Sequence, residues 1–253
     1  MESAGGRIIT GREVAEISIS EGKAAGVKVA RPGGEGHYPG YYSIPELEEM
    51  AADKVVAALP IYQLPALIDF SPSTSPMPGW WLKRIGDIMH EVTCLVGFML
   101  GLSEPVTDKL CFFSALSTPH AGFPFQGFPA SNFDPGVVPA GKQLLHTDVV
   151  CEYPGASDPF RRRRILDLLW RDLGEMFPGI EEAVEWKIPY YVAGCDGLAR
   201  KPGLVEGFKP KLQASGVEGL YFAGDTYTGR GLAMNSAALS AMHCADLILS
   251  HLE

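Results

Sequence analysis

The end of the chain holds the feature that restricts its fold most: an apolar run, a glycine-containing loop and a long apolar segment in immediate succession. Residues 219–225 (GLYFAGD) are typical of a short buried strand that ends in a tight turn. Residues 226–231 (TYTGRG) form the loop. From Leu232 to Leu249 the chain is rich in Ala, Leu and Met, which predicts a helix that is apolar over most of its surface and therefore buried.

Such a strand–loop–helix unit presents backbone N–H groups at the start of its helix. A helix N-terminus favours negative charge, and phosphates or an electron-rich ring edge commonly bind there. Gly229 and Gly231 allow a flat ligand to approach the backbone closely, and Asp225 can accept hydrogen bonds from a sugar-like chain. The same residues are equally consistent with an ordinary strand-to-helix connection, in which Gly231 serves packing alone. A nucleotide cofactor and a purely structural role therefore both remain open from these residues.

Two strand patterns precede this segment. Residues 6–30 alternate as a β-hairpin does, with a turn at residues 21–23. A connection rich in Gly, Pro and Tyr follows over residues 32–45. Val55–Pro60 then forms a continuous apolar run, which predicts a buried strand that ends at Pro60.

One helix in the middle of the chain has clear start and stop signals. Asp158 can cap it, Pro159 suits its first position, and Pro178-Gly179 ends it. Its apolar residues recur at helical spacing: Ile165, Leu168, Leu169, Leu173, Met176 and Phe177. The run Arg161–Arg164 opens this helix, where positive charge opposes the macrodipole. We interpret the run as a solvated face rather than as a site for an anionic partner.

Charge and cysteine usage argue against several classes of protein. The chain has 21 Lys and Arg against 30 Asp and Glu, a net charge of −9, so the footprint of nucleic-acid or anionic-membrane binding is absent. The longest apolar run, residues 93–102, is too short to cross a bilayer, and the first residues do not resemble a secretory signal. The five scattered cysteines form neither a metal motif nor a disulfide framework. We therefore expect a cytoplasmic protein without a transmembrane segment, a metal site or a nucleic-acid partner.

Five segments, in the right order, resemble a known family of flavoenzymes. Residues 219–249 look like the C-terminal flavin-contacting segment of FAD-dependent amine-oxidase and phytoene-desaturase-like oxidoreductases. Residues 5–29 and 52–60 are similar to the parts of those proteins that return to the FAD domain. Residues 130–145 (ASNFDPGVVPAGKQLL) and 177–186 (FPGIEEAVEW) resemble stretches of the desaturase branch. The resemblance covers nearly the whole chain.

This resemblance implies FAD as the cofactor and gives positions that would contact it. Gly224 and Asp225 would meet the ribityl-phosphate part, and the backbone of Val14 would meet the adenine. Four residues at the start of the last helix would face the pyrimidine edge of the isoalloxazine: Gly231, Leu232, Ala233 and Met234. The chemistry that the resemblance implies is removal of a hydride from a substrate C–H bond by the flavin.

The resemblance also implies a fold class and a division into domains. The expected class is α/β plus α+β. A C-terminal portion of a Rossmann-like FAD-binding domain would comprise residues 1–60 and 206–253, and a mixed-sheet substrate-binding portion would comprise residues 61–205.

One part of the family pattern is missing from this sequence. Family members carry a GxGxxG motif in a βαβ unit, which holds the FAD pyrophosphate. Gly33–Gly36 does not follow a suitable strand, so we reject it as this motif. Three interpretations follow: a subunit completed by a second polypeptide that supplies the GxGxxG half, a fragment of a longer protein, or a partner-binding domain that no longer holds flavin. We favour the two-polypeptide enzyme, because a lone half would leave sheet edges and apolar faces open.

The sequence favours an apolar substrate but identifies no catalytic residue. Amine oxidases of this family usually carry an aromatic ring just after the glycines, whereas Leu232–Met234 has none, although Tyr227 is near. This makes a small apolar organic molecule a better substrate than an amine. Five phenylalanines could line a pocket for it or serve as ordinary core, which is the better reading: Phe112, Phe113, Phe123, Phe125 and Phe128. Spacing alone assigns no role to the titratable residues of the middle: His120, His146, Asp148, Glu152, Tyr190 and Tyr191.

Overall fold

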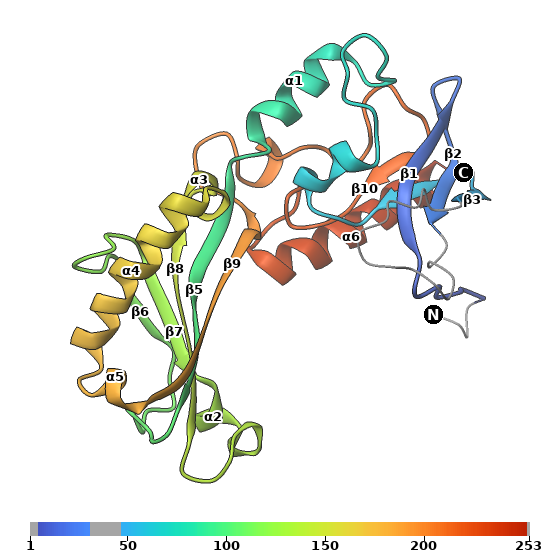
Figure 1. The fold of residues 1–253 in the computed structure, drawn as a ribbon. Coiled ribbons are helices and arrows are strands. Elements are labelled where there is room, and N and C mark those ends of the chain that lie inside the picture. Colours follow the sequence, from blue (N-terminus) through green and yellow to red (C-terminus); the bar gives the residue numbers. More distant parts are fainter. Residues whose placement is uncertain (1–4, 31–46, 252–253) are drawn as a thin grey trace. The chain divides into compact units, whose positions relative to one another are not determined.

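The structure is a computed structural model of the 253-residue chain (Figure 1). It describes residues 5–30 and 47–251, without the side chains of residues 193 and 196. The connection predicted over residues 32–45, which includes Gly33–Gly36, lies outside the described residues.

The chain folds as two compact units. Residues 1–89 and 200–253 form the first, and residues 90–199 form the second. The second unit thus begins later in the chain than the substrate-binding portion predicted over residues 61–205. Which unit binds cofactor and which binds substrate stays a prediction at this stage.

An antiparallel sheet of three strands opens the first unit. Strands β1 (Glu13–Ser20) and β2 (Lys23–Ala30) form the predicted hairpin, and β3 (Leu47–Ala51) pairs with β2. The turn contains Glu21 at φ 50° and Gly22 at φ 75°, and successive positive φ values are typical of tight hairpin turns.

A parallel pair of short strands forms the second sheet of this unit. Strand β4 (Val55–Ala57) is the predicted buried strand, and it pairs with β10 (Leu220–Phe222), the strand predicted near the C-terminus. The other edge of β10 is covered by residues 212–214, since the Phe222 N–H donates to the Leu212 carbonyl at 2.7 Å. In the described part of the chain, β4 has no strand on its other edge.

Helices pack against these strands. The 3-10 helix η2 (Ile61–Ala66) and helix α1 (Gly79–Ile88) contribute buried apolar side chains to the core, and Trp81 stacks on Phe222 with ring centroids 6.0 Å apart. A second 3-10 helix, η4 (Glu206–Phe208), precedes β10.

The last helix, α6 (Ala233–Ser250), corrects a prediction. Its composition indicated a buried helix, yet its buried residues are three small ones spaced four apart: Ser236, Ser240 and Cys244. The larger apolar side chains point outward, with Met234 86%, Met242 63% and Leu249 61% exposed. The described chain fully buries only the stripe of small residues, and a helix that is apolar on several faces needs cover on several sides.

The second unit is built on a five-stranded sheet. Its order is β6 (Phe113–Ala115), β7 (Phe125–Pro129), β8 (Gln143–Cys151), β5 (Val92–Leu102) and β9 (Val184–Leu198). Every pairing is antiparallel, whereas the family resemblance implied a mixed sheet. That expectation is wrong for this unit, because a resemblance in a few segments does not fix the direction in which neighbouring strands pair.

Helices of this unit connect the strands. The short elements α2 (Ala130–Phe133) and η3 (Pro135–Val137) join β7 to β8. Helices α3 (Tyr153–Ser157), α4 (Pro159–Met176) and α5 (Ile180–Ala183) join β8 to β9 (Figure 1).

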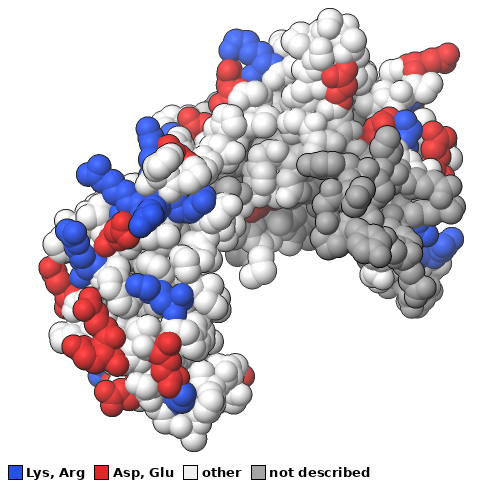
Figure 2. Space-filling view, in the orientation of Figure 1, with Lys and Arg blue, Asp and Glu red and all other residues white. Residues whose placement is uncertain are grey.

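Helix α4 confirms the predicted start, with Asp158 as its N-cap. The Asp158 carboxylate accepts hydrogen bonds from the N–H groups of Phe160 and Arg161, at 2.8 and 3.2 Å. Charged side chains gather on the visible surface over α4 and α5 in Figure 2, in keeping with the solvated face that the arginine run predicted.

Ring contacts and register show which face of the sheet α4 covers. Phe98 of β5 meets Trp170 of α4 edge to face at 5.9 Å, and the ammonium of Lys187 on β9 lies 3.6 Å from the centre of the same ring. Because side chains alternate along strands, the neighbours of these residues lie on the opposite face. We call this second surface the open face, since α4 lies on the other side of the sheet.

Candidate functional site

The glycine-containing loop of the first unit is tied to the helix that follows it. Gly224 has φ 143°, a value that favours glycine, and its N–H donates to the Ser240 hydroxyl at 2.7 Å. Gly229 lies so close to α6 that an added Cβ would come 2.9 Å from the Ser236 carbonyl oxygen. The loop therefore packs against the small-residue stripe of α6.

The start of α6 has no side-chain cap. Leu232 occupies the N-cap position, and its side chain makes no hydrogen bond to the first turn. Gly231 has φ 91°, and Ala233 has φ 47°, a left-handed conformation that costs a residue with a Cβ about 1–2 kcal/mol. Strain of this kind gathers at ligand-binding segments, where the surroundings hold it in place.

Lys209 holds the loop from a neighbouring segment, and sequence reasoning missed it. Its ammonium donates to the Asp225 carbonyl at 2.6 Å and to the Ser236 hydroxyl at 3.1 Å. Burial lowers the pKa of Lys209, with the charge of Asp225 partly opposing the shift. A single lysine outside any motif gave no signal for this role.

Tyr227, the aromatic residue nearest to the glycines, belongs to the core. Its ring is fully buried and stacks on Phe222 at 5.1 Å with an interplanar angle of 2°. Burial raises the pKa of this phenol. Tyr227 therefore does not supply the ring that amine oxidases of this type carry beside the flavin.

Six of the seven predicted cofactor residues lie on one continuous stretch, and one does not. Gly224, Asp225 and the residues from Gly231 to Met234 share the loop and the first turn of α6. Val14 lies on β1 in the three-stranded sheet, opposite Val29 and next to a register shift.

The loop residues fit a flavin. A glycine of positive φ, an uncapped helix N-terminus and exposed neighbours on either side offer backbone N–H groups to a flat, electron-rich ring edge. When bound, such a cofactor supplies hydride acceptance, which no amino-acid side chain provides.

The open face of the second unit holds a buried carboxylate. Asp148 of β8 is 1% exposed, and the Tyr190 hydroxyl of β9 donates to its Oδ2 at 2.7 Å. The hydrogen bond crosses β5, which lies between these strands and has Gly97 opposite both residues. At Gly97 the strands approach so closely that an added Cβ would come 2.6 Å from the Asp148 Cβ.

His146 lies beside this pair. Its ring stacks on the Tyr190 ring at 5.0 Å with an interplanar angle of 14°, and its Nδ1 is 3.8 Å from Asp148 Oδ2. Burial lowers the pKa of His146, and the negative charge of Asp148 partly opposes the shift. The imidazole is therefore neutral near pH 7 and able to accept a proton.

Aromatic rings extend the site from His146 along the open face. Phe128 packs against His146 at 5.0 Å, Phe112 against Phe128 at 4.9 Å, and Phe133 against Phe112 at 6.0 Å. We call the five residues from Phe133 through Phe112, Phe128 and His146 to Tyr190 the ring row.

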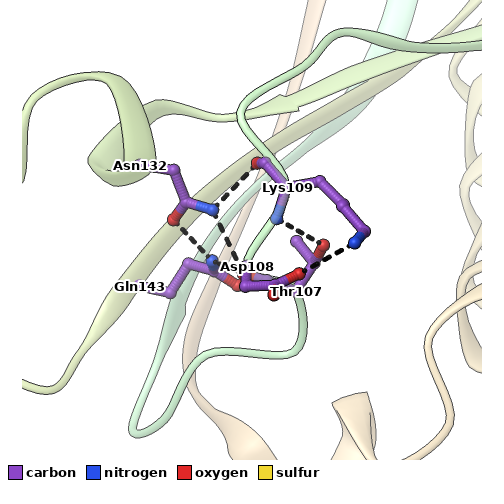
Figure 3. Close-up of polar contacts among 5 residues, drawn as sticks. All are labelled: Thr107, Asp108, Lys109, Asn132 and Gln143. Atoms are coloured by element: carbon purple, nitrogen blue, oxygen red, sulfur yellow. Dashed lines mark hydrogen bonds and ion pairs between the residues drawn. The ribbon is translucent and has the colours of Figure 1, made fainter.

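A pair of amide side chains, buried Gln143 and partly exposed Asn132, fixes one end of the ring row (Figure 3). Asn132 donates to the carbonyls of Thr107 and Lys109 at 3.1 and 3.0 Å, while Gln143 donates to the Thr107 carbonyl and to the Asn132 side-chain oxygen, both at 2.8 Å. These bonds hold the loop that leads to Phe112. The segment over residues 130–145, which resembled the desaturase branch, thus positions aromatic side chains.

The other predicted aromatic and titratable residues do not join the ring row. Phe113 packs on Phe177 at the end of α4, and Phe125 is buried on the helix-covered face. Phe123, His120 and Glu152 line a separate cavity of about 360 Å³ beside α4. Tyr191 lies under the guanidinium of Arg162, which is 3.8 Å from its ring centre.

In the described part of the chain, no helix is long and apolar enough to cross a membrane. No curated protein sequence matches the chain.

Three solved structures are similar to this chain. An oxidoreductase from Methanosarcina mazei has 21% identity and a TM-score of 0.67, with coverage of 97% of this chain and 51% of that one. A protein from Pyrococcus furiosus has 15% identity and a TM-score of 0.54, with coverage of 93% of this chain and 46% of that one. A geranylgeranyl bacteriochlorophyll reductase-like protein from Thermoplasma acidophilum has 16% identity and a TM-score of 0.51, with coverage of 95% of this chain and 49% of that one. The chain spans about half the length of each.

Likeness at these identities shows a shared fold, and the family follows from the sequence itself. The model of the family described as flavin containing amine oxidoreductase matches residues 1–249. This chain therefore belongs to the flavin containing amine oxidoreductases, whose cofactor is FAD.

Proposed function

We propose that this chain is the C-terminal half of an FAD-dependent oxidoreductase that removes a hydride from an apolar organic substrate. A second polypeptide, which carries the GxGxxG unit, completes it. The observation that carries this proposal is the surface of the first unit that the described residues leave uncovered, formed by α6 and by one edge of β4.

The parallel pair β4–β10 supports an incomplete sheet. Parallel sheets normally have several strands and are covered on both faces. Among the described strands β4 pairs only with β10, and the Val56 side chain is 42% exposed. A strand from the GxGxxG unit would extend this sheet along β4.

The outward side of α6 supports the same conclusion. Met234, Met242 and Leu249 lie exposed on a helix that is otherwise held by a stripe of small residues. Large apolar side chains left on one element are typical of a surface that another polypeptide covers. The chain spans about half the length of its structural neighbours, so each neighbour contains about as much polypeptide again as this chain.

In the completed enzyme we assign cofactor contacts to the residues that the family pattern indicates. Gly224 and Asp225 meet the ribityl-phosphate part of FAD, and the Val14 backbone meets its adenine. The N-terminus of α6, from Gly231 to Met234, stabilises negative charge on the reduced flavin.

The substrate class follows from the open face. The ring row and the exposed side chains of Met99 and Ile188 favour an apolar molecule over a charged amine. The buried position of Tyr227 agrees, because it leaves the loop without the ring that amine oxidases use.

The test is purification of the tagged chain from its own source, followed by a native mass and a visible spectrum. We expect a flavin spectrum and a co-purifying polypeptide with a GxGxxG motif. Met242→Lys on α6 should abolish co-purification, whereas Phe160→Lys, at an even more exposed apolar position on α4, should not. A colourless, well-folded single chain would overturn the proposal.

A further inference from the structure

The carboxylate of Asp148 is an unusual group to place in the middle of a sheet. A buried carboxylate is costly unless hydrogen bonds or charges compensate it, and an apolar residue would serve packing better. Here Gly97 on the central strand leaves the space through which the Tyr190 hydroxyl reaches Asp148. Three strands are thus shaped around one polar group, which points to a role other than packing.

A ligand can reach His146. Its side chain is 26% exposed, whereas Asp148 is 1% exposed. Its neighbours on the open face are Asp148 on its own strand, Tyr190 on β9, Phe128 on β7 and its register partner Met99 on β5. Among these neighbours only Asp148 and Tyr190 titrate, so they control the basicity and position of the imidazole.

We propose that His146 is an acid–base catalytic residue on the open face, with Asp148 and Tyr190 as its positioning residues. Its substrate is a flat, apolar molecule that carries a hydroxyl group. The apolar part lies along Phe128, Phe112 and Phe133, and the hydroxyl lies at His146. The oxidation in which this step takes part rests on the proposed function, while the proton transfer rests on the second unit alone.

The step is a transfer of one proton. With Nδ1 on the side of Asp148, the lone pair of Nε2 accepts the proton of the substrate hydroxyl. The O–H bond breaks, its electron pair stays on the substrate oxygen, and an N–H bond forms on the imidazole. The resulting imidazolium is stabilised by the carboxylate of Asp148, and the negative oxygen favours loss of a hydride from the adjacent carbon.

The ring row explains why the substrate is flat and apolar. From Phe133 to Tyr190 the ring centroids follow one another at 4.9 to 6.0 Å, so a planar molecule can contact several rings together. The titratable members of the row, His146 and Tyr190, lie together at one end of it, which gives the substrate an orientation.

The test uses the 253-residue chain alone, without flavin or partner, so its failure is distinct from failure of the proposed function. The probe is 2-naphthol, a flat aromatic alcohol that becomes a strong acid on excitation and emits as naphtholate when a nearby base takes its proton. We expect saturable binding and naphtholate emission from the bound probe. In His146→Gln the ratio of naphtholate to naphthol emission should fall at least about tenfold.

Further variants separate catalysis from structure. His120→Gln, at a histidine on the helix side of the sheet, should leave the ratio unchanged. Tyr190→Phe should lower it and Tyr191→Phe should not. Phe112→Ala should weaken binding about fivefold through loss of one ring contact.

The dependence of the emission ratio on pH separates a catalytic histidine from a structural one. A histidine that only supports the fold would not set the midpoint of this dependence. The ratio should fall as the pH falls through the pKa of His146, because imidazolium cannot accept a proton. In Asp148→Asn this midpoint should lie about one pH unit lower, since the carboxylate raises the basicity of His146. An unchanged ratio in His146→Gln, an unmoved midpoint in Asp148→Asn, or absence of saturable binding would overturn the inference.

Discussion

The candidate sites of the two units are built in opposite ways. In the first unit, backbone groups of one continuous stretch, residues 224–234, form the site, and glycines serve its conformation. In the second unit, side chains from three strands and a loop form the site, and Gly97 provides space rather than conformation. A site made from one stretch of backbone can be recognised in a sequence, whereas a site made from distant side chains appears only when the strands are paired.

The largest effect should come from filling the space at Gly97. In Gly97→Ala the new methyl group would lie 2.0 Å from the Thr147 carbonyl oxygen, so β5 and β8 must separate. We expect the free energy of unfolding, measured with urea, to fall by about 3 kcal/mol. The control is Gly174→Ala in α4, where an added Cβ meets nothing within 4 Å and should stabilise by about 0.5–1 kcal/mol. If Gly97→Ala were as stable as the native chain, the close approach of β5 and β8 would not require glycine at position 97.

Removing the hydroxyl of Tyr190 should have the next largest effect. Tyr190→Phe keeps the ring but takes a hydrogen-bond donor from a buried carboxylate, which should cost about 1–3 kcal/mol of unfolding free energy. Tyr191→Phe, one residue further on β9, should change stability by less than about 0.5 kcal/mol. Similar losses in the two variants would contradict the view that side chains, not strand pairing, hold this site together.

In the first unit, Lys209→Met tests whether Lys209 stabilises the loop and the start of α6 through its hydrogen bonds. Because burial lowers the pKa of Lys209 in the folded state, the unfolded chain binds more protons at alkaline pH. The native chain should therefore gain stability relative to Lys209→Met as the pH rises from the lowered pKa towards the ordinary one. At neutral pH the variant should lose about 1 kcal/mol through its two hydrogen bonds. If the free energies of unfolding of the native chain and the variant differ by the same amount across this pH range, the lowered pKa of Lys209 does not affect stability.

The smallest effect should come from relieving strain at the start of α6. Glycine at position 233 adopts φ 47° without a steric penalty from a Cβ, but it loses more conformational entropy on folding than alanine does. We expect the net result of Ala233→Gly to be a gain of about 0.5 kcal/mol in the free energy of unfolding. Thermal unfolding of both proteins at one concentration measures the difference. A clear destabilisation would mean that Ala233 adopts an ordinary helical φ.

Most of the elements of the first unit could be predicted from sequence, because each is local. Turn residues at 21–23, an apolar run at 55–57 and the glycine loop at 224–231 specify their structure within a few residues. The burial of α6 could not be predicted, since composition records how apolar a helix is but not which face the described chain covers.

In the second unit, the sequence indicated the helix after Asp158 but not the sheet. The antiparallel order and the meeting of His146, Asp148 and Tyr190 depend on pairing between strands that lie more than forty residues apart. No short stretch of the sequence specifies how β5 pairs with β8 and β9. The sequence therefore shows that these histidines and tyrosines are present, but it does not show which residues they contact or what role they have.

The outward methionines and leucine of α6 also have a consequence for how the chain behaves in solution. With a net charge of −9, copies of the chain repel one another, and this repulsion works against contact between their apolar helices. At about 0.15 M salt the Debye length is only about 8 Å, so most of the repulsion is screened. Self-association, and with it solubility, should then depend on ionic strength: dilute salt keeps copies of the chain apart, whereas about 0.15 M salt allows contact between their α6 helices.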